Sequence, residues 1–80
     1  MNILYSRLAA KALDSMIPST KQRILNGISG IPNGDIKKLK KHTSLYRLRI
    51  GDWRIVFSYP DRETVLIERI SLRGEIYKEI

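Results

Sequence analysis

Two runs of alternating apolar and polar residues flank the pair Gly51-Asp52, and they constrain the fold more than any other feature of the sequence. Residues 45–50 and 53–59 each alternate with a period of two, which places successive side chains on opposite faces of a β-strand. Gly-Asp between such runs is typical of a tight turn, because glycine adopts the positive φ that these turns require. The sequence therefore predicts an antiparallel hairpin centred on residues 51–52.

The alternation also predicts what each face of this hairpin carries. A two-residue turn pairs Ile50 with Trp53 and Arg49 with Arg54. One face then holds the apolar residues Leu48, Ile50, Trp53, Ile55 and Phe57, and the other holds Arg47, Arg49 and Arg54. We expect the apolar face to meet the core and the arginine face to point to solvent. Because like charges directly opposite one another destabilise a sheet, the arginines suggest a site for an anion such as phosphate.

Helical spacing replaces this alternation in the first third of the chain. After a short strand at residues 3–5, Ser6 is the expected N-cap of a helix. The apolar stripe of this helix is Leu8, Ala9, Ala12, Leu13 and Met16. Pro18 ends this helix, and Ser19 or Thr20 is expected to cap a second one.

The second helix has the apolar face Ile24, Leu25 and Ile28, and Gly30, Pro32 and Gly34 end it and begin a loop. Residues 60–62 predict a second turn, and residues 64–70 a third strand of the sheet. The predicted fold class is α+β: an antiparallel β-sheet meander with an N-terminal helical hairpin packed on one face, in a single domain over residues 1–80.

Composition excludes several classes of function. The chain has 80 residues, a net charge of +7, no cysteine and one histidine. Disulfides, thiol chemistry and Cys- or His-rich metal centres are therefore not expected, and no cofactor is predicted. No apolar run is long enough to span a bilayer and no signal peptide is recognisable, so we expect a cytoplasmic protein without a membrane partner. A pI near 10.1 favours polyanionic partners.

The positive charge is concentrated in residues 36–54, where seven basic residues face one acid. They are Lys37, Lys38, Lys40, Lys41, Arg47, Arg49 and Arg54. Two interpretations remain open at this point: a nucleic-acid surface, or an ordinary solvated face with a basic loop over residues 37–41. Trp53, Phe57 and Tyr59 are expected in the core, since they share a face with aliphatic residues.

Three segments, residues 34–39, 45–57 and 70–78, resemble the RelE toxins of the RelE/ParE superfamily in order and spacing. The most specific element is Tyr-Arg-x-Arg-x-Gly-Asp-aromatic-Arg, followed by Arg-Gly-Glu-x-Tyr. The resemblance implies a β-α-α-β-β-β layout and a ribosome-dependent, metal-independent endoribonuclease. Such toxins cleave mRNA in the ribosomal A site and are neutralised by an acidic RelB-like antitoxin.

The same resemblance implies roles for individual residues. Arg54, Arg73 and Tyr77 match catalytic positions of the family, and Arg47 and Arg49 match its paired basic residues on the second strand. With Lys37, Lys38, Lys40 and Lys41 they form the expected RNA-binding set. Two alternatives stay open: a non-catalytic or inactive homologue that binds ribosomes or nucleic acid, and a ParE-like inhibitor of DNA gyrase.

Overall fold

The hairpin that the alternation predicts is the centre of the sheet. In the computed structural model, which describes residues 2–39 and 44–72, β3 (Tyr46–Ile50) and β4 (Trp53–Asp61) pair antiparallel. Ile50 lies opposite Trp53 and Arg49 opposite Arg54, so the predicted register is confirmed. Gly51 has a φ of 58°, the left-handed conformation that the turn requires.

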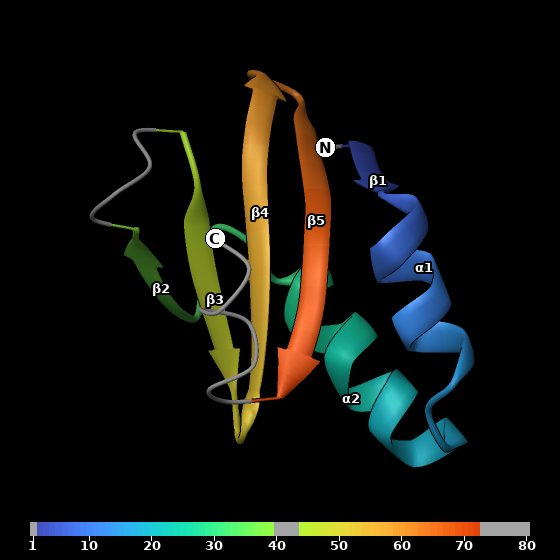
Figure 1. Ribbon diagram of the computed structural model, residues 1–80. Helices are drawn as coiled ribbons and strands as arrows, with labels where there is room; N and C mark the ends of the chain where they lie inside the picture. Colours follow the sequence, from blue (N-terminus) through green and yellow to red (C-terminus); the bar gives the residue numbers. More distant parts are fainter. Residues whose placement is uncertain (1, 40–43, 73–80) are drawn as a thin grey trace.

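Three more strands complete the sheet. β5 (Thr64–Leu72) pairs antiparallel with β4, and β2 (Asp35–Lys38) pairs antiparallel with β3. β1 (Asn2–Tyr5) pairs parallel with β5, which gives the order β1-β5-β4-β3-β2 (Figure 1). The α+β class is confirmed, but the sheet is mixed rather than a purely antiparallel meander. The long connection between β1 and the remaining strands, which contains both helices, permits this parallel pairing.

The segment predicted as a basic loop is partly a strand. Lys37 and Lys38 belong to β2, whose residues pair with β3 in register from Asp35 opposite Arg49 to Lys38 opposite Tyr46. Lys40 and Lys41 lie outside the described residues. The loop after the second helix therefore ends at Gly34 rather than continuing into the lysines. A strand this short and polar carries little signal of its own and forms because β3 offers it an edge to pair with.

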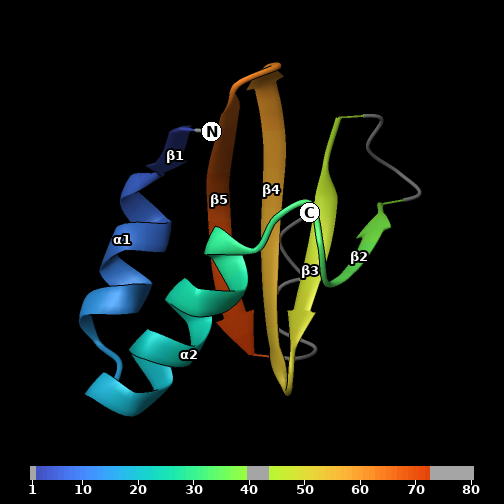
Figure 2. The ribbon, with the colours of Figure 1, turned by 180° about the vertical axis from the view of Figure 1, so that it is seen from behind.

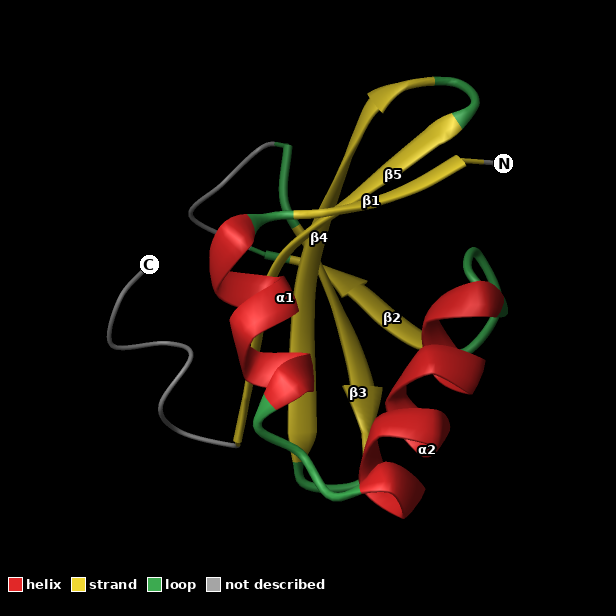
Figure 3. Ribbon diagram, turned by 90° about the vertical axis from the view of Figure 1, so that its right-hand side faces the viewer, coloured by secondary structure: helices red, strands yellow, loops and turns green. Residues whose placement is uncertain are grey.

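Both helices lie on one face of the sheet (Figures 2 and 3), with α1 (Arg7–Asp14) near β1 and β5 and α2 (Pro18–Ser29) in contact with β3. The Ser6 hydroxyl accepts a hydrogen bond from the Ala9 amide at 3.1 Å, so the predicted N-cap is confirmed. The predicted cap of α2 is wrong. Ile17 is the N-cap and Pro18 occupies the first turn, where proline's missing N–H costs nothing.

The core lies between the helices and the apolar face of the sheet. Its completely buried members include Ile24, Ile28, Ile55, Phe57 and Ile67. Leu8, which was predicted to join the α1 stripe, is 55% exposed, because Ala9 and Leu13 take the inward positions. α2 approaches β3 closely at Gly27, where a Cβ would collide with the Ile50 side chain. Within the described ranges, no helix is long and apolar enough to cross a membrane.

Matched substitutions test this assignment of the core. Ile28→Ala should lower the free energy of unfolding by about 2–5 kcal/mol, because it leaves a cavity under α2. Ile17→Ala removes the same atoms from a side chain that is 66% exposed. It should change the free energy of unfolding by less than about 0.5 kcal/mol. Urea denaturation followed by circular dichroism measures both values. Equal effects of the two substitutions would contradict the packing described here.

Candidate nucleic-acid interface

The face of the sheet opposite the helices carries two rows of side chains in register across four strands. This face is turned toward the viewer in Figure 1. Strand pairing aligns one row as Lys37, Arg47, Val56 and Arg69, and the next row as Asp35, Arg49, Arg54 and Ser71. Neighbouring strands lie about 4.8 Å apart, so five cations lie within an area about four strands wide. We call these two rows the basic face.

Arg47 and Arg49 share one carboxylate on the basic face. Arg47 Nη2 lies 3.7 Å from Asp35 Oδ1, and Arg49 Nε lies 3.6 Å from Asp35 Oδ2. Their surroundings differ, because the Arg47 side chain is only 10% exposed and that of Arg49 is 57% exposed. The expectation that all three arginines point to solvent is therefore wrong for Arg47, which is buried in a row between Lys37 and Val56.

Arg54 is held by the turn that precedes it. Its Nη1 donates hydrogen bonds to the carbonyl oxygens of Gly51 at 2.8 Å and Trp53 at 3.0 Å. These bonds fix the plane of the guanidinium, whose Nε and Nη2 carry three further N–H donors in the same plane. Arg54 is thus a rigidly positioned cation, the property that a group stabilising transition-state charge requires.

A β-bulge brings Arg69 onto the basic face, a residue that sequence reasoning missed. Strict alternation from Ile67 places Arg69 among the core residues. The register between β4 and β5 shifts at Val56/Phe57, so that Phe57 pairs with Ile67 while Val56 pairs with Arg69. The available signal was the spacing of Ile67 and Ile70, which are both buried although three residues apart.

The other predicted site residues are not all brought together here. Lys37 lies on the basic face. Lys38 is paired with Tyr46, and both of these residues lie on the helix side of the sheet. Lys40, Lys41, Arg73 and Tyr77 lie outside the described residues. Asp35, which the sequence analysis did not include, is the acid that the register adds to the site.

Three aromatic side chains, Tyr46, Phe57 and Tyr59, form a cluster on the helix side of the sheet. Phe57 stacks on Tyr46 with ring centroids 5.7 Å apart, and Tyr59 contacts both rings edge-on. Phe57 is fully buried and Trp53 packs against the core, as predicted, whereas Tyr59 is 37% exposed. Burial, with a smaller contribution from Tyr46, raises the pKa of Tyr59, so this phenol stays protonated at neutral pH.

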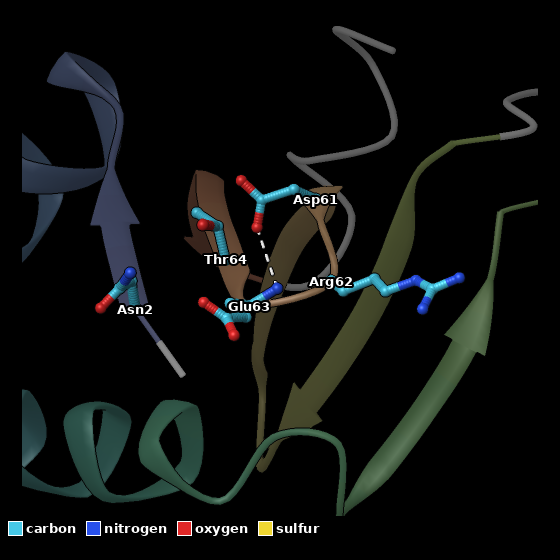
Figure 4. A pocket seen from close by; sticks show the side chains of 5 residues that line it. All are labelled: Asn2, Asp61, Arg62, Glu63 and Thr64. Carbon is cyan, nitrogen blue, oxygen red and sulfur yellow. Dashed lines mark hydrogen bonds between the residues drawn. The ribbon is translucent and has the colours of Figure 1, made fainter.

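A shallow hollow of about 400 Å³ lies at the β4–β5 turn, lined by Asn2, Asp61, Arg62, Glu63 and Thr64 (Figure 4). Asp61 accepts a hydrogen bond from the Glu63 amide at 2.9 Å. This bond, aided by the Thr64 hydroxyl, holds the pKa of Asp61 below its usual value. The carboxylate therefore stabilises the turn. Among the described residues, no three His, Cys, Asp or Glu side chains group as metal ligands.

Solved structures with the same architecture are toxins and toxin–antitoxin complexes. The RelB-RelE antitoxin–toxin complex from Methanococcus jannaschii matches with 25% identity and a TM-score of 0.76, over 96% of this chain and 98% of that chain. The RelE-RelB complex from Pyrococcus horikoshii matches with 25% identity and a TM-score of 0.72, over 92% and 96%. The isolated E. coli RelE toxin has 16% identity and a TM-score of 0.74, over 98% and 92%.

No protein-family model and no curated protein matches the chain. Two helices packed on a mixed five-stranded sheet nevertheless define a fold class, and it is the class of these toxins. The chain is RelE-like: it is structurally similar to the RelE toxins of toxin–antitoxin systems, as its sequence motifs predicted.

The bonds of Arg54 to its turn predict a measurable contribution to stability. Arg54→Ala should lower the free energy of unfolding by about 1 kcal/mol, because two hydrogen bonds to backbone carbonyls are lost. Arg49→Ala removes an equal charge from the opposite position in β3 and should cost less than about 0.5 kcal/mol. Urea denaturation distinguishes the two. An Arg54→Ala variant as stable as the unaltered protein would contradict a guanidinium held by the turn.

Proposed function

We propose that this protein is the toxin of a type II toxin–antitoxin system and a ribosome-dependent endonuclease that cleaves mRNA in the A site. The observation that carries the proposal is the set of five cations on the basic face of a RelE-like sheet. The proposed toxin is a single domain, residues 1–80, acting in the cytoplasm on translated messages.

The proposed reaction is an attack by the 2′-oxygen of the RNA on its own adjacent phosphate. The new O–P bond gives a 2′,3′-cyclic phosphate, the P–O5′ bond breaks, and the leaving 5′-oxygen takes a proton from water or from a group of the ribosome to become a 5′-hydroxyl. No metal is required, provided that the attack is in line and the charge of the phosphorane is stabilised. Arg54 is suited to this electrostatic role, because its turn already fixes its guanidinium.

The remaining roles follow from the resemblance. Arg47 and Arg49 would bind the flanking phosphates, and Arg73 would share the charge stabilisation with Arg54. Arginine remains protonated in proteins and cannot accept the 2′ proton. That proton would pass to Tyr77 or to a group of the ribosome. In the second case the reaction would depend on the ribosome.

An acidic, RelB-like antitoxin is the proposed regulator. Two of the similar structures are complexes of RelE with RelB, and this chain has a net charge of +7. Several large apolar side chains are exposed near β1 and the helices, namely Leu4, Leu8 and Ile17. A partner with acidic and apolar residues would cover both kinds of surface.

Cleavage in cells tests the catalytic role of Arg54. Induction of the protein should arrest growth, and primer extension should map 5′ ends at a fixed phase within codons of translated messages. Arg54→Ala should reduce cleavage by about 10²–10³-fold, the usual effect of losing one preorganised donor. Arg7→Ala, which removes an equal charge from α1 on the other side of the sheet, should leave it unchanged.

The other outcomes identify the alternatives. Ribosome binding without cleavage by the unaltered protein would favour a non-catalytic or inactive homologue. A ParE-like inhibitor would arrest growth without cutting messages, and it would also block supercoiling by purified gyrase. Random cuts, or an Arg54→Ala variant as toxic as the unaltered protein, would contradict the proposed mechanism.

Co-expression tests the proposed partner. An acidic protein encoded beside this chain should bind it, co-purify with it and restore growth when both are induced, because it covers the basic and apolar surfaces. Raising the salt concentration should weaken the complex to the extent that charge pairing contributes. Normal growth on induction of the chain alone, together with no complex in a pull-down, would contradict this proposal.

A further inference from the structure

Asp35 has a place on the basic face that the proposed function does not by itself require. Its two carboxylate oxygens are divided between two arginines, Oδ1 facing Arg47 at 3.7 Å and Oδ2 facing Arg49 at 3.6 Å. The register explains this arrangement, because Asp35 lies directly opposite Arg49, and Arg47 is the next residue of β3 on the same face. A group with two oxygens therefore already bridges the two guanidinium groups.

The distances show that this bridge is loose. Charge-assisted hydrogen bonds between a guanidinium and an oxyanion are about 2.7–2.9 Å long, so neither contact of Asp35 is a formed hydrogen bond. The Asp35 side chain is 48% exposed, and solvent reaches both it and Arg49. The ion pair of Asp35 with Arg49 is therefore weak, because water and salt screen it, whereas Arg47 lies largely shielded from solvent.

We propose that Asp35 is an internal counter-ion that occupies a phosphodiester site between Arg47 and Arg49, and that RNA displaces it on binding. A phosphodiester also offers two oxygens, and it can approach both guanidinium groups to hydrogen-bond distance without the constraint of the β2 backbone. In the free protein the carboxylate lies beside Arg47, whose side chain is only 10% exposed. The inference rests on the proposed function and specifies how the same face is regulated.

The direction of the expected effect follows from competition. Removing the charge of Asp35 takes away the group that RNA must displace, so Asp35→Asn should bind single-stranded RNA more tightly. A residue that merely positioned the arginines would give the opposite result. Asp14→Asn is the matched control, since Asp14 lies on α1 behind the sheet with a side chain 80% exposed and loses the same charge.

The experiment is a binding titration at 0.15 M salt with a 2′-O-methyl hexanucleotide, which lacks the attacking hydroxyl and cannot be cleaved. Asp35→Asn should bind about fivefold more tightly than Asp14→Asn, the factor that corresponds to about 1 kcal/mol. The gain should shrink in the Arg49→Ala background and persist in full in the Arg54→Ala background, because Arg49 lies beside the carboxylate of Asp35 whereas Arg54 is bonded to the turn. A gain of equal size in both backgrounds would show a general field effect and overturn the inference.

Other outcomes separate the two proposals. If the unaltered protein and Asp35→Asn both fail to bind the hexanucleotide, this inference is overturned, whereas the proposed function, which requires the ribosome, is judged by the mapping of cuts in translated messages. If the unaltered protein binds but Asp35→Asn binds no more tightly than Asp14→Asn, the inference alone is overturned.

Asp35→Asn also leaves Arg47 without its carboxylate, so a thermal melt accompanies the titration. Should that variant unfold, NMR on the unaltered chain gives the answer. The Asp35 Cγ and Arg49 Nε resonances should shift together as the hexanucleotide is added, since the carboxylate leaves as the phosphate arrives. An unmoved Asp35 Cγ signal at saturation overturns the inference.

Discussion

The antiparallel pairing of β3 with β4 is the constraint on which the rest of this structure depends. Side chains alternate between the faces of a strand, so a slip of one residue would send the arginines into the core and the aliphatic residues to the opposite surface. Gly51 fixes the turn and with it the register that sets Arg49 opposite Arg54. The core, which receives Leu48 and Ile55, and the basic face are therefore two consequences of one pairing.

That register places two like charges directly opposite each other, an arrangement that destabilises a sheet. Each guanidinium has a compensating contact. Arg49 faces the carboxylate of Asp35 from β2, and Arg54 donates to the Gly51 and Trp53 carbonyls of the turn. The two contacts differ in kind, because the first uses a side-chain carboxylate from the edge strand β2 and the second uses backbone carbonyl dipoles of the turn. One arginine is consequently paired with a side chain and the other with the main chain.

The helices have a different role in this arrangement. They cover the apolar face and leave the basic face on the other side of the sheet (Figure 2). The close approach of α2 at Gly27 seats it directly against Ile50, next to the turn that orients Arg54. The proposed chemistry thus takes place on the face of the sheet opposite the core that supports it.

Local patterns in the sequence were enough to predict several elements of this fold. Period-two alternation and a Gly-Asp turn predicted the hairpin and its register, helical spacing and Ser6 predicted α1, and residues 34–78 carried the resemblance to RelE. Features that depend on pairing between distant segments emerge only when the chain is folded. Parallel β1 fills the edge of β5, and Asp35 reaches Arg49 through β2, because sheet edges accept strands from anywhere in the chain. The bulge that turns Arg69 onto the basic face follows from the pairing of β5 with β4, which a local pattern does not specify. The burial of Arg47 is likewise a property of the folded chain.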